Sequence, residues 1–310
     1  MLSFLNRRKR QTGVTVGVAF GPDGVAAAAV RAAGRDAPPH LLHAGYHAHR
    51  DGDAGEWLAG WVDANDLAKC RAVGVIADAD YQVMQVEAPP VPATELRQAA
   101  GWRVRELIDF PLDQAVIDTF PPPDDAQRGQ NNLNVVVARR AVVAERIEQL
   151  REAGLGLEAV DIPELAQRNV SLRLPEARGG HALLALDDHD GLVTVFRDGA
   201  QYLARGLDSG RRALAESADE AGEALLLEVQ RSLDYFESAL SQPPLGALYV
   251  FPGGGPVDGL VERFADTLGS VELRAFGLAD LVTVEQEPAH DGALTLHAVG
   301  AGLREAEKGA

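Results

Sequence analysis

Residues 14–31 read VTVGVAFGPDGVAAAAVR, and residues 181–197 read HALLALDDHDGLVTVFR. Each stretch is a strand of apolar and β-branched residues, a turn rich in glycine and aspartate, and a second apolar strand, which predicts a hairpin. Both hairpins are followed by a third strand, a helix and a short buried strand. We therefore predict a mixed α/β fold that contains the same β-β-β-α-β unit twice. The further elements expected in the two units are strands at 41–48, 72–77, 200–205 and 246–251, and helices at 53–69 and 215–241.

Prolines and glycines divide the rest of the chain. Pro89, Pro90 and Pro92 mark a boundary, after which a helix capped by Thr94, two strands and another helix predict a compact α/β insert. Gly179-Gly180 marks a second boundary. The expected parts are a basic tail at 1–13, a first lobe at 14–87, the insert at 88–162, a helix returning to the first lobe at 163–180, a second lobe at 181–295, and a closing helix and tail at 296–310.

Composition excludes several classes of protein. The 310 residues carry a formal charge of −17, which disfavours nucleic acid as a partner. No run of 18 apolar residues and no secretory signal is visible, and the single cysteine cannot form an internal disulfide. The three lysines lie outside any phosphate-binding GxxxxGK motif. We expect a globular protein of the cytoplasm.

The first residues stand apart from this acidic composition. Arg7, Arg8, Lys9 and Arg10 follow a short apolar segment that contains Leu2, Phe4 and Leu5. Cations beside an apolar tip favour weak contact with an anionic membrane surface. A solvated chain end is the alternative interpretation.

The duplicated unit resembles the actin-like ATPases, in which two hairpins enclose the phosphates of a nucleotide. Residues 14–21, which end at Gly21, resemble their first phosphate loop. The resemblance implies a two-lobed, ribonuclease H-like duplicated fold that binds ATP with Mg²⁺. The residues that it places at the nucleotide are Asp187, Asp190 and Gly191 in the second phosphate loop, and Gly253, Gly254 and Gly255 in the adenosine loop.

Three longer segments are similar to the PilM family of type IV pilus assembly proteins, and within it to the MshI-like branch of MSHA-type pili. They are ELRQAAGWRVRELIDFPLDQAVIDTF at 95–120, EVQRSLDYF at 228–236 and AVGAGLR at 298–304. The resemblance implies that the insert takes the place of an actin subdomain, as in FtsA. It also implies an adaptor on the cytoplasmic face of the inner membrane, which binds the N-terminal tail of a PilN-like membrane protein.

The predicted nucleotide site departs from that of an active ATPase. Ala19 stands where the family places an acid that helps to hold Mg²⁺, Pro22 removes a backbone N–H donor, and His189 stands where glycine is expected. We therefore expect little or no hydrolysis. Three alternatives remain open at this point: an actin-like ATPase that hydrolyses nucleotide, a small-molecule kinase of the same superfold, and the cytoplasmic domain of a type II secretion platform protein.

Overall fold

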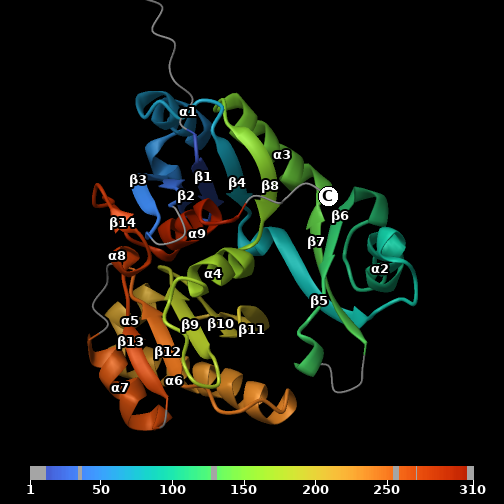
Figure 1. Cartoon of the computed structure of the whole chain (residues 1–310), viewed down its shortest axis with the longest axis vertical. Coiled ribbons are helices and arrows are strands. Elements are labelled where there is room, and N and C mark those ends of the chain that lie inside the picture. Colours follow the sequence, from blue (N-terminus) through green and yellow to red (C-terminus); the bar gives the residue numbers. More distant parts are fainter. Residues whose placement is uncertain (1–11, 34–36, 127–130, 254–257, 270, 306–310) are drawn as a thin grey trace, which may run out of the picture.

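The first lobe is built on a six-stranded sheet with the order β14-β3-β2-β1-β4-β8 (Figure 1). The computed structural model describes residues 12–33, 37–126, 131–253, 258–269 and 271–305. Neighbouring strands β1, β2 and β3 are antiparallel, whereas β4 and β8 run parallel to β1. The strands are β1 (Val14–Phe20), β2 (Gly24–Arg31), β3 (His40–Ala48), β4 (Arg71–Val75), β8 (Gly156–Asp161) and β14 (Thr283–Val284).

The second lobe repeats the topology of the five strands β3-β2-β1-β4-β8 of the first lobe. Its sheet has the order β11-β10-β9-β12-β13, again with three antiparallel strands and two strands parallel to the first. The pairing confirms the duplication predicted from the two hairpins. The strands are β9 (His181–Leu186), β10 (Gly191–Arg197), β11 (Ala200–Leu207), β12 (Ala247–Phe251) and β13 (Glu272–Ala275).

A smaller subdomain projects from the first lobe (Figure 1). Its sheet has the order β5-β7-β6, from β5 (Tyr81–Glu87), β6 (Ala115–Phe120) and β7 (Asn132–Arg139), and α2 (Leu96–Val104) packs against it. The chain enters this sheet before residue 88, because residues 81–87 pair with β7. The chain has returned to the first lobe before residue 162, because β8 pairs with β4. The prolines at 89–92 lie in a loop inside the subdomain.

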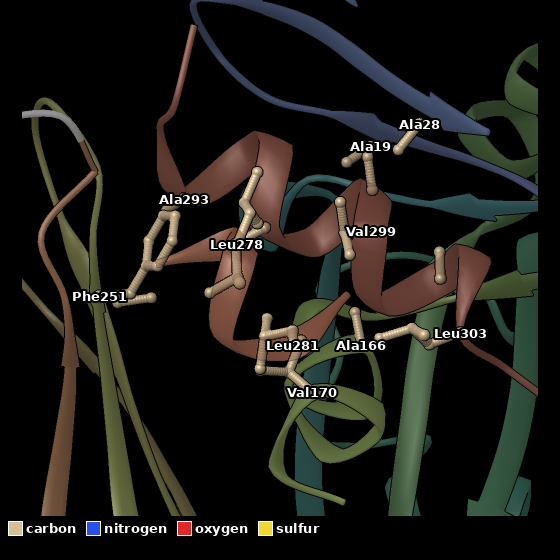
Figure 2. Packing of buried hydrophobic residues seen from close by; sticks show 14 of the residues in the cluster. Ala19, Ala28, Ala166, Val170, Phe251, Leu278, Leu281, Ala293, Val299 and Leu303 are labelled. Atoms are coloured by element: carbon tan, nitrogen blue, oxygen red, sulfur yellow. The ribbon is translucent and has the colours of Figure 1, made fainter. Parts of the chain in front are cut away.

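Helices cover both faces of the first sheet. Val14, Val16 and Val18 point to the face covered by α1 (Ala54–Ala64) and α3 (Arg140–Glu152). Ala19 points to the opposite face, under α9 (Ala293–Gly302), as Figure 2 shows. Gly17 lets α9 lie directly on the sheet, because a Cβ atom there would be 2.7 Å from the Gly302 nitrogen and closer still to the Ala298 carbonyl oxygen.

The two lobes are joined through a pair of helices. The helix α4 (Pro163–Ser171) follows the first lobe in sequence but packs against the sheet of the second, while α9 follows the second lobe and packs against the first. Ala166 and Val170 of α4 meet Val299 and Leu303 of α9 in one core that also includes residues of both sheets (Figure 2). The lobes therefore share a continuous hydrophobic centre.

A polar network crosses this centre. Thr194 Oγ1 of β10 donates a hydrogen bond to Gln167 Oε1 of α4 (2.6 Å), and the Gln167 amide nitrogen lies 3.3 Å from His297 Nε2 of α9. Burial lowers the pKa of His297 to about 4, so the imidazole is neutral at pH 7. Because buried polar groups are costly without partners, the network specifies how the two helices and the second sheet fit together.

Several predicted helices differ in detail from those observed. The predicted helix at 215–241 is α5 (Arg211–Glu216), α6 (Ala218–Asp234) and a π-helical turn (Tyr235–Ala239). The cap predicted at Thr94 was wrong, because α2 begins after a 3₁₀ turn and has no side-chain cap. No helix in the described part of the chain is long and apolar enough to cross a membrane. The remaining helices are α7 (Asp258–Leu268) and α8 (Leu278–Leu281).

Candidate functional site: the cleft between the lobes

Two turns face each other across the cleft between the lobes. The turn between β1 and β2 closes with a hydrogen bond from Gly21 N to Gly24 O (2.9 Å), and that between β9 and β10 with one from Asp187 N to Asp190 O (2.8 Å). His189 Nε2 lies 3.3 Å from Asp23 Oδ2, so an ion pair joins the turns when the imidazole is protonated. The two predicted phosphate loops thus come together in space.

A cavity of about 330 Å³ lies beneath these turns. It contains four of the residues predicted for the nucleotide site: Gly21, Asp187, Asp190 and Gly191. Gly253 lies two residues after β12, close to the Leu186 carbonyl oxygen, and Gly254 and Gly255 lie outside the described residues. Four titratable residues that also line the cavity had no role predicted from the sequence: Asp78, Tyr81, Glu164 and His297.

The electrostatics of this cavity disfavour a phosphate. Burial and the neighbouring charges of Asp78 and Asp187 raise the pKa of Asp190 to about 6. Burial also raises the pKa of Asp187. Among the described residues that line the cavity, none is lysine or arginine. A polyphosphate would therefore meet carboxylates rather than cations, and would depend on bound metal to offset them.

Glu164 and Tyr81 form a hydrogen-bonded pair that lines the cavity. Tyr81 Oη donates a 2.6 Å hydrogen bond to Glu164 Oε2, and burial raises the pKa of both groups. Tyr81 and Glu164 lie close together because β5 and α4 both begin at this edge of the first sheet. Even so, no group of three or more potential metal ligands is present within the described ranges.

The first turn is apolar at position 19, where the actin-like resemblance implies an acid that helps to hold Mg²⁺. Ala19 is completely buried in the core between β1 and α9. A Cβ atom on Gly21 would be only 3.0 Å from Leu294 Cδ1, so α9 covers the glycine with a hydrophobic side chain. Pro22 lines the cavity and contributes no N–H donor. The first turn therefore offers the cavity neither an acid at position 19 nor an N–H donor at position 22.

Arg211 places a cation against the second turn. Its Nη2 atom lies 2.5 Å from Asp188 Oδ1 and 3.9 Å from Asp187 Oδ1, and its side chain is only 17% exposed. Its Nη1 atom would be 3.1 Å from a Cβ atom on Gly253, whose φ of +60° favours glycine. The guanidinium thus fills the space between the second turn and the glycine expected to approach the adenosine. No motif in the sequence had indicated this residue.

The raised pKa of Asp190 gives a prediction about stability. Burial raises the pKa of this carboxyl group from its ordinary value of 3.8 to about 6. Its ionised form therefore opposes folding above pH 6, and this penalty disappears below pH 3.8. We expect Asp190→Asn to raise the free energy of unfolding at pH 7.5 by roughly 1 kcal/mol, a value reduced by partial solvent screening. Urea unfolding at pH 7.5 and 4.5 measures this.

The control for Asp190→Asn is Asp113→Asn, at an exposed aspartate of the smaller subdomain. It removes the same formal charge at a distance from the cleft. An Asp190→Asn gain that is equal at the two pH values would contradict the assigned cause, because only the ionised carboxylate opposes folding.

Comparison with known proteins places the fold. A scan against protein-family models finds no match, and a search of curated proteins finds none either. Among solved structures, a chain of a PilM–PilN type IV pilus biogenesis complex matches with a TM-score of 0.70 and 20% identity, covering 93% of this chain and 97% of the other. The cytoplasmic domain of EpsL, an inner-membrane component of the Vibrio cholerae type II secretion system, matches with a TM-score of 0.55 and 14% identity, covering 94% and 96%.

The class of fold follows from the topology and these matches together. The chain has the two-lobed actin-like fold, with a duplicated sheet and an inserted three-stranded subdomain. Both matches extend over nearly the whole of each chain, so they include the insert as well as the two lobes.

Proposed function

We propose that this protein is an adaptor of the PilM type, which binds the N-terminal tail of a PilN-like inner-membrane protein in a type IV pilus assembly platform of the MSHA kind. The observation that supports this most is the match over 93% of the chain to a protein of a PilM–PilN complex. The acidic cleft, without an acid at position 19, supports a protein that hydrolyses little or no ATP. In this proposal the adaptor works on the cytoplasmic face of the inner membrane.

A trough between the smaller subdomain and the second lobe fits an extended peptide. Two cavities of about 250 and 350 Å³ share Phe120 and Gln201, so they form one continuous depression. One wall is β5 and the Pro121–Pro123 segment, and the other includes β11 and the α4 residue Leu165. We propose that the tail of the PilN-like protein lies in this trough.

The walls of the trough offer both main-chain and side-chain recognition. Strands β5 and β11 are edge strands, which can pair with an added strand, and pockets beside them would hold alternate side chains. Val83 on β5 is 41% exposed and Tyr235 is 43% exposed, although both are hydrophobic, and both line the trough. An apolar segment of the tail would cover them.

Asp125, in the loop after β6, contacts three residues of the second lobe beside the trough. Tyr202 Oη of β11 donates a 2.7 Å hydrogen bond to Asp125 Oδ1, and Gln242 Nε2 donates to the Asp125 carbonyl oxygen (3.3 Å). Arg197 lies 3.7 Å from the same carboxylate. These contacts tie the loop after β6 to the second lobe, and so fix the width of the trough.

Titration calorimetry with a synthetic peptide of the PilN-like tail from the same organism tests this function. We expect saturable binding, and we expect Val83→Glu to weaken it at least about ten-fold, because a carboxylate would replace a methyl-lined contact. Leu107→Glu is the matched control: Leu107 is 60% exposed on the same subdomain but outside the trough. No affinity for the wild-type protein, or equal loss in both variants, would count against the proposal.

A further inference from the structure

One half of the peptide trough adjoins the cleft between the lobes. We call this half, the cavity of about 250 Å³, the inner half of the trough. It shares Val83, Glu164 and Ala204 with the cavity of about 330 Å³ beneath the two turns. Within the part of the chain that the structure describes, Glu164 is the one charged residue that lines the inner half. A peptide in the trough would therefore meet a single carboxyl group there, among carboxamide, phenol and apolar side chains.

The carboxyl group of Glu164 is almost completely removed from solvent. The residue is 8% exposed and lies in the first turn of α4, directly after Pro163. Tyr81 Oη holds the side chain in place through the 2.6 Å hydrogen bond to Glu164 Oε2. The N-terminus of α4 supplies only partial positive charge, whereas a glutamate this deeply buried is rarely found without a cationic partner.

No arginine or lysine of the described residues neutralises Glu164. The neighbouring buried acid Asp161 has such a partner, because its Oδ2 atom lies 2.8 Å from Arg304 Nη1. Glu164 makes no ion pair within the described ranges, and the ionisable side chains Asp78 and Asp161 beside it are both acidic. Burial raises the pKa of Glu164 accordingly. A cation that entered the inner half would offset the cost of this buried charge.

We propose that Glu164 is a specificity-determining residue of the trough and binds a cationic group of the PilN-like tail. This group is the side chain of a lysine or arginine, or the N-terminal ammonium of the tail. It enters the inner half and pairs with the Glu164 carboxylate, while Tyr81 keeps its hydrogen bond. A neutral segment would leave the carboxylate buried without a counter-charge, so the trough discriminates against it. The inference rests on the proposed function, because the tail must first occupy the trough.

Titration calorimetry on the full-length protein with two forms of the tail peptide tests this pairing. One is the tail peptide of the PilN-like protein from the same organism. In the neutral form the N-terminus is acetylated, each lysine is norleucine and each arginine is citrulline. Glu164→Gln keeps an acceptor for Tyr81 but removes the charge. We expect this variant to bind the cationic peptide about ten-fold more weakly than the wild type does, and both proteins to bind the neutral peptide equally.

A third peptide identifies the source of the cation. It carries the acetylated N-terminus and keeps its lysines and arginines. It should bind the wild type like the neutral peptide if the terminal ammonium pairs with Glu164, and like the cationic peptide if a side chain does.

The stability of the free protein distinguishes a binding role of Glu164 from a structural one. Glu164→Gln removes a buried charge that has no counter-ion before the tail binds, so we expect its free energy of unfolding at pH 7.5 to equal or exceed that of the wild type. Urea unfolding measures this. A variant that is less stable and binds both peptides more weakly would show that Glu164 only supports the fold, and would overturn the inference.

The matched control is Glu106→Gln. Glu106 has an 85% exposed side chain on the smaller subdomain and lies outside the trough, so its loss reports the general attraction of an acidic protein for a cationic peptide. An equal loss of affinity in this control, or an unaffected Glu164→Gln variant, would overturn the inference and leave the proposed function standing. Absence of binding between the wild type and the cationic peptide would overturn both.

Discussion

Gly17→Ala should remove about 3 kcal/mol or more from the free energy of unfolding. Its Cβ atom would lie 2.7 Å from the Gly302 nitrogen and 2.9 Å from the Ala298 carbonyl carbon. Both are backbone atoms of α9, so no side chain can rotate away, and the helix that joins the lobes must move off the first sheet. The free energy of unfolding of a domain is only about 5–15 kcal/mol, so adding this one methyl group would remove a large part of the stability. Urea unfolding measures the effect.

Gly60→Ala is the matched control for Gly17→Ala. Gly60 lies inside α1, and a Cβ atom there would meet nothing within 4 Å. We expect this variant to be stabilised by up to about 1 kcal/mol, because alanine has the higher helix propensity. A Gly17→Ala protein as stable as wild type would show that α9 does not lie against β1 as described.

Ala19→Asp should destabilise the protein by about 3 kcal/mol without producing ATPase activity. Ala19 is fully buried between β1 and α9 and has no room for a solvated carboxylate. The acid that the actin-like resemblance places at this position would thus meet hydrophobic side chains in place of a metal. The measurements are urea unfolding at pH 7.5 and phosphate release from Mg-ATP.

The pH dependence of the free energy of unfolding distinguishes the effect of the charge in Ala19→Asp from the effect of its size. Burial would raise the pKa of the introduced carboxyl group, so its charge opposes folding at pH 7.5, and that part of the deficit should shrink as the pH falls below the raised value. Ala19→Val adds volume without charge, so we expect its loss in free energy of unfolding to be the same at pH 7.5 and at lower pH. An Ala19→Asp protein that folds like the wild type and hydrolyses ATP would mean that the cleft is a working catalytic site.

The duplicated topology could be predicted because its signals are local. Two apolar hairpins with Gly-Pro-Asp-Gly and Asp-His-Asp-Gly turns specify antiparallel pairs within a few residues. The short parallel strands β8 and β13 were not identified, since their pairing depends on neighbours far away in the sequence. Strand β5 was not predicted either, and its residues were assigned to the first lobe, because its partner β7 follows only after α2 and β6.

The cleft could be predicted only in part. The two facing turns follow from the duplication, and their glycines and aspartates mark them in the sequence. Glu164, Tyr81 and His297 reach the same cavity from α4, β5 and α9, and no spacing within the chain reveals that meeting. Asp78 had a usable signal, since it follows the buried strand β4, and the carboxyl ends of such strands point into the cleft.

We propose that the tail of the PilN-like protein binds in the trough and that the neighbouring cleft hydrolyses little or no ATP. Hydrogen exchange on the protein with and without the tail peptide is the sharpest test of this proposal. We expect slower exchange of the amides along the edge strands β5 and β11, and unchanged exchange at the turns 21–23 and 187–190. Protection confined to those two turns, or produced by Mg-ATP and absent with the peptide, would contradict it.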